Sequence, residues 1–277
     1  MTFGREFYKN PDILLSSFEE MNRNYKVQKN KSWLLDRLKK VYIFFFGIPE
    51  IGLQVRSLYF KKIVGGKISP KISRILDAGS GIGIYSFWLS KNFPDSQIEG
   101  WEIDKKKILF SKKMKEEIKL NNVNFFYQDL TKVNTNKKYD LIINIDVLEH
   151  IQDYKKVLRA FYRILNKKGY LYLHTPQPNQ RRIFKAMKKW EHESHIREGY
   201  EEGYLIDELK NIGFRVILAK KTFGFFGKLA WELNHLSFKK GFILAGILFP
   251  FLYVLSLLDI NFDNKDVLWS AILARKI

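Results

Sequence analysis

The stretch Arg74–Asp104, RILDAGSGIGIYSFWLSKNFPDSQIEGWEID, decides the fold of this 277-residue chain. A short apolar run leads to Asp77, a turn with glycine at every second position follows at Gly79–Gly83, and the apolar periodicity of Tyr85–Leu89 is typical of a helix. Glycine lacks Cβ, so it can adopt positive φ and let a ligand approach the backbone, while the helix N-terminus presents unpaired N–H groups. The order of strand, glycine turn and helix predicts a nucleotide-binding turn.

A second apolar run, Gln97–Trp101, ends in Glu102, about 20 residues beyond the first glycine of the turn. In a doubly wound sheet, an acid at this position binds the two ribose hydroxyls of a nucleoside. The turn and the acid together therefore predict a nucleoside site. Three spaced glycines also occur in tight turns that bind no ligand, and the turn alone leaves that alternative open.

The segment Asp77–Gly83, DAGSGIG, has an acid before the turn and alternating glycines, which differs from the GxGxxG pattern of dinucleotide sites. It resembles motif I of the class I S-adenosylmethionine-dependent methyltransferases. The resemblance implies S-adenosyl-L-methionine as cofactor, with the turn beside its methionine part and the acid ordering the turn and meeting the ammonium group. The residues that it assigns to the cofactor here are Asp77, Ala78, Gly79, Gly81, Gly83, Glu102 and Ile103.

A charged surface helix is predicted over Lys105–Leu120, and a third strand, Val123–Tyr127, is followed by Asp129 and Leu130. In the same family a similar acid after the third strand accepts a hydrogen bond from the adenine amino group. The resemblance therefore implies that these two residues contact the cofactor. An aspartate at the end of a strand can instead cap the next helix, and the sequence leaves both roles open.

The run Leu141–Ile145 has the continuous apolar character of a strand that is buried on both faces, which is typical of a central parallel strand. With the following turn Val147–His150, VLEH, it resembles motif II of the small-molecule methyltransferases. In that branch the end of the strand and the turn lie beside the transferred methyl group. The resemblance adds Asn144 and Ile145 to the implied cofactor contacts.

Further elements follow in the order that this family has. They are a helix at Tyr154–Leu165, a strand at Tyr170–His174, a helix at Leu205–Asn211, a strand at Phe214–Lys220 and a last strand at Val267–Lys276. The segment His195-Ile196-Arg197 is similar to one in methyltransferases of the ubiquinone-biosynthesis type. We expect an α/β, Rossmann-like seven-stranded class I methyltransferase sheet, with an N-terminal helical cap and a hydrophobic helical insertion between the last two strands.

The expected division places the helical cap at residues 1–73, the cofactor-binding core at 74–221, the insertion at 222–264 and the final core strand at 265–277. Within the cap, helices are predicted from Trp33 to Phe45 and from Leu53 to Ile63, on either side of a break at Gly47-Ile48-Pro49. We expect this cap to pack on the sheet and close the cofactor pocket. Contact between its first helix and lipid is the alternative.

Methyl transfer to an oxygen acceptor needs a base, and imidazole accepts a proton near neutral pH. The candidate bases are His150, His174, His192 and His195. We favour His195 as the catalytic base, then His150, with Glu149 of the same turn as a third catalytic candidate. A histidine in such a turn or in a polar loop can also simply pack or stay solvated.

Asp146, Glu149 and His150 also have a spacing, i, i+3 and i+4, that one helical turn places on one face. This trio resembles the E-x-x-E-H group that holds a divalent ion in ubiquinone O-methyltransferases, with the shorter aspartate in place of the first glutamate. A hydrogen-bonded turn without a metal is the interpretation that we favour, and we predict no metal ligand.

The composition is strongly basic, with 48 Lys and Arg against 29 Asp and Glu and a net charge of +19. Such a charge implies an anionic partner: nucleic acid, an acidic membrane face or an anionic substrate. The absence of cysteine excludes disulfides, thiolate zinc sites and a cysteine nucleophile. The first twenty residues carry several charges and no apolar core, so we expect no secretory signal and a cytoplasmic location.

The segment Gly241–Leu258, GFILAGILFPFLYVLSLL, follows two lysines and has no charged residue, and its length reaches the lower limit for a membrane span. The sixth and seventh strands must share one sheet, so the chain has to return on the same side, and the charges before Gly241 make a poor second crossing. We expect monotopic membrane attachment, with Pro250 kinking the segment into a re-entrant or hairpin shape. A buried lid or dimer contact and a true span are the alternatives.

The resemblance implies a methyltransferase. The charge and the apolar segment lead us to expect that it is cytoplasmic and peripherally associated with the inner membrane face, where anionic lipid head groups meet its basic residues. The expected acceptor is hydrophobic or lipid-linked, such as a quinone precursor, a polyprenyl-linked intermediate or a lipid, with transfer to oxygen. A nucleic-acid methyltransferase is the second interpretation; the chain lacks the Asn-Pro-Pro-Tyr type of motif for base amines, so we expect no nucleic-acid partner. A non-catalytic binding protein on the same fold is the third. No pattern predicts the oligomeric state.

Overall fold

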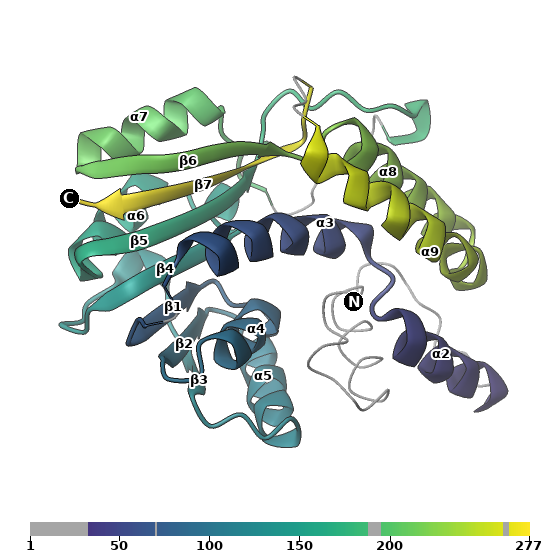
Figure 1. Cartoon of the computed structure of the whole chain (residues 1–277), viewed down its shortest axis with the longest axis horizontal. Helices are drawn as coiled ribbons and strands as arrows, with labels where there is room; N and C mark the ends of the chain where they lie inside the picture. The colour runs from purple at the N-terminus through teal and green to yellow at the C-terminus, as the bar shows by residue number, and fades with distance from the viewer. Residues whose placement is uncertain (1–32, 70, 188–194, 263–265) are drawn as a thin grey trace. The chain divides into compact units, whose positions relative to one another are not determined.

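A computed structural model describes residues 33–69, 71–187, 195–262 and 266–277 of the chain (Figure 1). The chain divides into two compact units. The helical unit comprises the described residues of Met1–Leu58, Arg181–Trp190 and Phe223–Asp266. The sheet unit comprises the described residues of Tyr59–Gln180, Glu191–Thr222 and Val267–Ile277. The first part of the expected cap and the hydrophobic insertion thus belong to the same unit.

The sheet unit contains a seven-stranded sheet in the order β3-β2-β1-β4-β5-β7-β6 (Figure 1). Strands β1 to β5 run parallel, and β7 pairs antiparallel with both β5 and β6. The bounds are β1 Arg74–Ala78, β2 Gln97–Glu102, β3 Val123–Tyr127, β4 Tyr139–Ile145, β5 Leu165–Pro176, β6 Phe214–Thr222 and β7 Trp269–Lys276. This is the class I methyltransferase sheet that the sequence predicts, including its antiparallel last strand.

The strand order reverses between β1 and β4, because the chain passes outward from β1 through β2 to β3 and then returns to the other side of β1. The carboxyl ends of these parallel strands meet at one edge of the sheet. In open α/β sheets, ligands bind at that edge where the strand order reverses. The glycine turn after β1 and the VLEH turn after β4 therefore both stand at the expected binding edge.

The sheet unit has helices α4 Ile84–Asn92, α5 Lys105–Glu117, α6 Tyr154–Ile164 and α7 Glu202–Ile212. Aspartates start two of them: Asp104 accepts a 2.8 Å hydrogen bond from the N–H of Lys106, and Asp153 accepts one of 3.2 Å from the N–H of Lys156. Helix α7 stops at Gly213, whose φ of 113° lies in the left-handed region.

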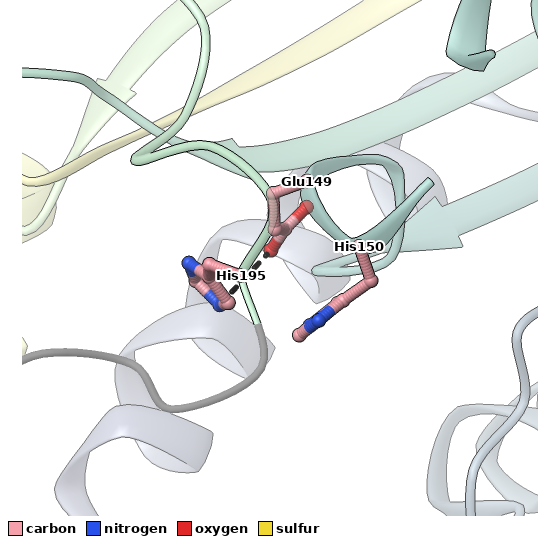
Figure 2. A group of neighbouring side chains, drawn as sticks. All are labelled: Glu149, His150 and His195. Carbon is pink, nitrogen blue, oxygen red and sulfur yellow. Dashed lines mark ion pairs between the residues drawn. The ribbon is translucent and has the colours of Figure 1, made fainter. Parts of the chain in front are cut away.

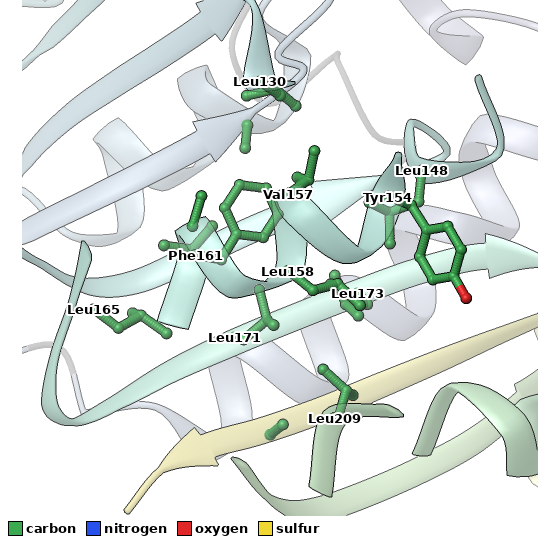
Figure 3. Packing of buried hydrophobic residues seen from close by; sticks show 14 of the residues in the cluster. Leu130, Leu148, Tyr154, Val157, Leu158, Phe161, Leu165, Leu171, Leu173 and Leu209 are labelled. Carbon is green, nitrogen blue, oxygen red and sulfur yellow. The ribbon is translucent and has the colours of Figure 1, made fainter. Parts of the chain in front are cut away.

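The main hydrophobic core lies between α6, α7 and the middle strands (Figure 3). On α6, Val157, Leu158 and Phe161 are fully buried, at the spacing of one helical face. They pack in one cluster with Leu171 and Leu173 of β5, which lie two residues apart and so share a face of the sheet. This core holds the carboxyl ends of β4 and β5 at fixed positions.

The opposite face of β5 presents Tyr172, which contacts Phe60 at a ring-centroid distance of 5.5 Å. Phe60 ends α3, Ile51–Phe60, and is followed by a π-helical turn at Lys61–Gly65. Its ring also packs edge-on against Tyr85 and Trp88 of α4, at 5.0 and 5.1 Å. The end of the expected cap therefore packs on the sheet; its closure of a cofactor pocket stays a prediction.

The helical unit contains α2 Trp33–Phe46, the start of α3, α8 Phe225–Lys240 and α9 Phe242–Leu257. Helices α8 and α9 form a hairpin that turns at Gly241, with φ of 134°. The carboxylate of Asp259 closes the other end of the hairpin, because it accepts hydrogen bonds from the N–H groups of Gly224 and Gly227 at 3.1 and 2.8 Å. The chain thus reverses at Gly241 and not at Pro250, which lies inside α9. A kink at Pro250 stays a prediction.

Candidate active site

The glycine turn after β1 has three residues in the left-handed region, with φ of 87° at Gly79, 55° at Gly81 and 84° at Gly83. A Cβ at Gly79 would overlap the side chain of Val147, and one at Gly83 would lie 2.7 Å from the ring of Phe125. A Cβ at Gly81 would meet no atom within 4 Å in the described chain. The outer two glycines are therefore required by packing, whereas the middle one leaves open space beside the turn.

Glu102 at the end of β2 points at this turn. Its Oε2 accepts a 2.9 Å hydrogen bond from the N–H of Gly81, and its Oε1 accepts bonds of 2.8 and 2.9 Å from the N–H groups of Ile103 and Asp104. A carboxylate has about four acceptor positions, so these three bonds leave room for a further donor such as a ribose hydroxyl. The sequence placed Glu102 beside the glycine turn, and the hydrogen bond to Gly81 joins the two.

Asp77 lies beneath the turn and is almost fully buried. Its Oδ2 accepts a 2.6 Å hydrogen bond from the hydroxyl of Ser86 on α4, which ties the end of β1 to the helix. Burial, reinforced by the negative charge of Glu102, raises the pKa of Asp77 to about 7. A positive charge that binds nearby would favour the ionised carboxylate.

The other predicted cofactor residues are spread along the same edge. Asn144 of β4 donates a 2.6 Å hydrogen bond to the carbonyl oxygen of Ala78, while its Oδ1 is buried without a partner among the described residues. Ile145, which follows it, is half-buried, and Ile103 is exposed beside Glu102. The structure thus places an unsatisfied amide oxygen and an exposed apolar side chain near the turn.

Asp129 caps the 3-10 turn Leu130–Lys132. Its Oδ1 accepts hydrogen bonds of 2.9 and 2.7 Å from the N–H and the hydroxyl of Thr131, which hold the pKa of Asp129 below its usual value. Leu130 packs in the main core. The capping role that the sequence left open is the one that the structure displays, and the adenine contact stays a prediction.

A second group of chemically active side chains gathers after β4 (Figure 2). Glu149 and His150 belong to the 3-10 turn Leu148–His150, and His195 comes from the segment before α7. The rings of His150 and His195 are 4.6 Å apart and nearly perpendicular, and Nε2 of His195 lies 4.0 Å from Oε1 of Glu149. All three residues that the sequence named as catalytic are thus brought together.

The segment after His195 is fastened to this turn by backbone carbonyl groups. The N–H of Ile196 donates to the carbonyl of Glu149 at 3.1 Å, and the guanidinium of Arg197 donates to the carbonyls of Ile151 and Gln152 at 2.8 and 3.0 Å. The hydroxyl of Tyr200 donates to the carbonyl of Leu148 at 2.9 Å. Sequence reasoning noted the His-Ile-Arg segment but missed the positioning roles of Arg197 and Tyr200.

Burial, together with the nearby His150, lowers the pKa of His195 to about 4. Its ring is therefore neutral at physiological pH and has a nitrogen that can accept a proton. Glu149 beside it is fully buried. A neutral imidazole next to a carboxylate is an arrangement that can act as a general base.

The donor atoms of Glu149, His150 and His195 lie within 4.8 Å of one another, so this set could also hold a divalent cation. The trio that the sequence suggested for a metal contained Asp146 instead. The Oδ1 of Asp146 lies 2.7 Å from Nδ1 of His174. The prediction that the protein has no metal ligand stays a prediction.

His174 is fully buried, and its other ring nitrogen lies 3.1 Å from the hydroxyl of Thr222. The pair with Asp146 holds the residue after β4, which has a φ of 52°, at the point where the strand meets the VLEH turn. Both ring nitrogens of His174 thus contact other side chains inside the protein, so His174 is a weaker candidate for the catalytic base. His192 lies outside the described residues.

Comparison with known proteins agrees with this geometry. The profile of the methyltransferase-domain family matches residues 50–219. Malonyl-[acyl-carrier protein] O-methyltransferase 1 of Ilyobacter polytropus is 26% identical over 156 residues, which are 56% of this chain and 58% of that protein. This chain therefore spans less than two thirds of the length of that relative.

Two solved structures share the fold. Phosphoethanolamine N-methyltransferase 2 of Haemonchus contortus, in complex with S-adenosyl-L-methionine, aligns with a TM-score of 0.59 at 18% identity, over 92% of this chain and 59% of that one. The O-methyltransferase of a trans-AT polyketide synthase of Brevibacillus brevis, in complex with S-adenosyl-L-homocysteine, aligns with a TM-score of 0.56 at 15% identity, over 91% and 79%.

The fold, the glycine turn and the family profile together define a class I S-adenosylmethionine-dependent methyltransferase domain. This chain belongs to the methyltransferase-domain family, and the cofactor of this class is S-adenosyl-L-methionine. The residues present fit that cofactor, because open space at Gly81 lies beside the remaining acceptor capacity of Glu102 and near the buried acid Asp77.

Proposed function

We propose that this protein transfers a methyl group from S-adenosyl-L-methionine to an oxygen atom of an amphiphilic small molecule at a membrane surface. The observation that carries the proposal is the group of Glu149, His150 and His195 beside the carboxyl end of β4. That edge of the sheet also carries the glycine turn. The name of one similar protein, a malonyl-[acyl-carrier protein] O-methyltransferase, supports oxygen as the acceptor.

In this proposal the glycine turn and Glu102 hold the nucleoside, and Asp77 provides negative charge beneath the turn. The bound cofactor supplies an electrophilic methyl group on a sulfonium. A ring nitrogen of His195 would accept the proton that the acceptor hydroxyl gives up. Positioning of the acceptor contributes roughly 7–11 kcal/mol to lowering the barrier, and a base contributes about 10²–10⁴-fold in rate.

Glu149 has a supporting role in this scheme. Once His195 has accepted the proton, its ring is positively charged in a site that disfavours charge, as its low pKa of about 4 indicates. The carboxylate of Glu149, 4.0 Å from Nε2, offsets that cost by attraction. His150 stands edge-on to the same ring and fixes its orientation.

The acceptor in this proposal combines an apolar body with a hydroxyl or carboxyl oxygen. Examples are a quinone precursor, a polyprenyl-linked intermediate and a lipid. The apolar surface of the helical unit supports an acceptor of this kind, because large hydrophobic side chains of α9 remain exposed there. Action on the cytoplasmic side of the inner membrane stays a prediction.

The test is mass spectrometry of lipid extracts that have been incubated with the full-length protein and methyl-labelled S-adenosyl-L-methionine. We expect one labelled lipid-soluble product, which is lost with His195→Ala although cofactor binding measured by calorimetry persists. Label in RNA would overturn the proposal in favour of a nucleic-acid methyltransferase. Cofactor binding with no labelled product from lipid extract or RNA would favour a non-catalytic binding protein.

A further inference from the structure

Helix α9 presents an apolar stripe on its exposed side. The stripe consists of Ile243, Ile247, Phe251 and Val254 of α9 and of Leu258, the first residue of the 3-10 turn that follows it. Their spacings of four, four, three and four residues place them on one helical face. Their exposed fractions run from 42% at Leu258 to 72% at Phe251. The buried side of α9 is also apolar, with Ala245, Phe249 and Leu252 packed inside the helical unit. The helix is therefore hydrophobic on both sides, although only one side is covered within the described chain.

A second stripe lies on α2 of the same unit. Leu38, Val41 and Phe45 follow each other at i, i+3 and i+7 and are 49–56% exposed. The two helices are in contact, because the hydroxyl of Tyr42 donates a 2.6 Å hydrogen bond to the carbonyl of Gly246 on α9. Exposed apolar side chains thus occur on two helices that are in contact with each other. An apolar surface of this kind on a soluble domain usually marks an interaction site.

The segment Phe242–Asn261 has the length of a membrane span, with 20 residues, a mean hydropathy of 2.2 and 33% of its most hydrophobic window buried. The way in which the insertion is connected to the sheet argues against a membrane crossing by this segment. Thr222 at the end of β6 pairs with Trp269 at the start of β7, so both ends of the insertion are joined to neighbouring positions in one sheet. If α9 crossed the membrane, α8 would have to cross back.

Helix α8 has buried charged side chains that bind partners within the helical unit. Lys228 is buried and makes a 2.7 Å ion pair with Asp266. Glu232 is fully buried and accepts hydrogen bonds from the N–H groups of Ile183 and Phe184 at 3.0 and 2.9 Å. These charged side chains hold α8 to other segments of the helical unit, and removing them into hydrocarbon would cost several kcal/mol each. These buried charges therefore argue against a crossing of the membrane by α8, and with it against one by α9.

The charge of the chain favours a lipid surface over a second copy of the protein. The chain carries a net charge of +19, and Lys239 and Lys240 stand exposed at the end of α8, directly before the stripe begins. Anionic head groups attract such residues by about 1 kcal/mol per lysine near the surface. Two copies that met through this surface would bring like charges together, which is unfavourable.

We infer that α9 lies in the plane of one leaflet of an anionic lipid bilayer, with the α9 stripe and the α2 stripe inserted at the boundary of head groups and acyl chains. The inference deepens the proposed function, because an enzyme held at this boundary meets amphiphilic acceptors there. It can fail separately from that function, since membrane binding is measured without cofactor or acceptor.

The first experiment is flotation of the full chain with vesicles of phosphatidylcholine and phosphatidylglycerol. We expect the wild-type protein to float, and the double variant Ile247→Glu, Phe251→Glu to bind at least about tenfold more weakly. Leu109→Glu is the matched control, because Leu109 is 68% exposed on α5 of the sheet unit. Equal flotation of the wild type and the double variant would overturn the inference. So would a protein that ignores the vesicles and forms a dimer that the double variant dissociates.

The second experiment measures depth, and it uses the absence of cysteine in the chain. Single cysteines replace Ile243, Ile247, Phe251 or Val254, each carries an environment-sensitive fluorophore, and nitroxide lipids quench at known depths. A helix in the plane of the leaflet gives one shallow depth at all four positions. A depth that increases from Ile243 to Phe251 would show a span and would contradict the inference. A label at Leu109→Cys, which we expect to remain unquenched, reports non-specific adsorption.

Discussion

The guanidinium of Arg197 donates a 2.8 Å hydrogen bond to the carbonyl oxygen of Ile151, one residue beyond the turn that carries Glu149 and His150. His195 stands two residues before Arg197, so this bond sets the distance between the proposed base and its partners. The same guanidinium also lies over the ring of Tyr154, 5.0 Å from its centroid. Arg197 is therefore a positioning residue, which acts through the segment that it holds.

Replacing Arg197 with alanine should lower kcat by about 100-fold, because a displacement near 1 Å of a catalytic group has an effect of that size. The cofactor site is built from other segments, so the dissociation constant for S-adenosyl-L-methionine should change little. A purely structural role would instead lower the amount of folded protein without a change in kcat per folded molecule. The readout that separates the two is the NMR titration of His195, whose pKa should move from about 4 toward its usual 6.5 in the variant.

The low pKa of His195 also predicts a pH dependence of activity and stability. The ring is neutral above about pH 4 in the folded protein, so the base should lose activity only as the pH falls toward that value. Between about 6.5 and 4 the unfolded chain binds a proton that the folded chain does not, and the contribution of His195 to the free energy of unfolding should therefore fall as the pH is lowered. His195→Gln should remove this part of the slope, as measured by urea unfolding at several pH values. An unchanged slope would contradict the assignment.

The binding of S-adenosyl-L-methionine should be coupled to the release of a proton from Asp77. Its pKa of about 7 leaves the carboxyl partly protonated at neutral pH, and the positive charges of S-adenosyl-L-methionine favour the ionised form. Binding should therefore release protons, and the affinity should rise as the pH increases through 7. Calorimetry in two buffers with different ionisation enthalpies measures the release. Asp77→Asn should bind without it, whereas equal proton release by the variant and the wild type would show that another group is responsible.

In the absence of cofactor, the same carboxyl should oppose folding at higher pH. The folded protein binds a proton on Asp77 between the usual pKa of 3.8 and about 7, so this part of the stability is present below 3.8 and is lost as the pH rises through 7. Bound cofactor should offset that loss. The comparison is the unfolding temperature with and without S-adenosyl-L-methionine at pH 6 and pH 8, roughly one pH unit below and above the pKa of Asp77.

Replacement by alanine should have different effects on stability at Gly79 and at Gly81. At Gly81 the added Cβ meets only open space, so Gly81→Ala should cost about 1–2 kcal/mol from its positive φ and should mainly weaken cofactor binding. At Gly79 the Cβ overlaps Val147 as well, so Gly79→Ala should destabilise the fold more than Gly81→Ala. Denaturant unfolding and calorimetry of the two variants test this order. A more stable Gly79→Ala would contradict the packing at that position.

Much of the sheet could be predicted because its parallel strands are buried on both faces and appear as continuous apolar runs, as Leu141–Ile145 does in β4. The approach of Glu102 to the glycine turn was predictable for a similar reason. Adjacent parallel strands bring their carboxyl ends together, so the end of β2 must lie beside the turn after β1.

Other relationships depend on tertiary contacts that have no local pattern. The packing of His195 against Glu149 and His150 rests on hydrogen bonds from Arg197 across 46 residues of sequence. The spacing of Asp146, Glu149 and His150 did not predict the pairing of Asp146 with His174, which arises because β4 and β5 are neighbours in register. The hairpin of α8 and α9 turns at Gly241, and Asp259 fixes its opposite end by a hydrogen bond from Gly227. This contact spans 32 residues of sequence and also has no local pattern.

The central claim is that the glycine turn and Glu102 hold the nucleoside of S-adenosyl-L-methionine, and titration calorimetry of the folded protein tests it most directly. We predict one binding site in the wild type and at least about tenfold weaker binding by Glu102→Ala, with Glu99→Ala, on the same strand, as the control. A folded wild-type protein that does not bind S-adenosyl-L-methionine, or a Glu102→Ala variant that binds it as tightly as the wild type, would contradict the claim.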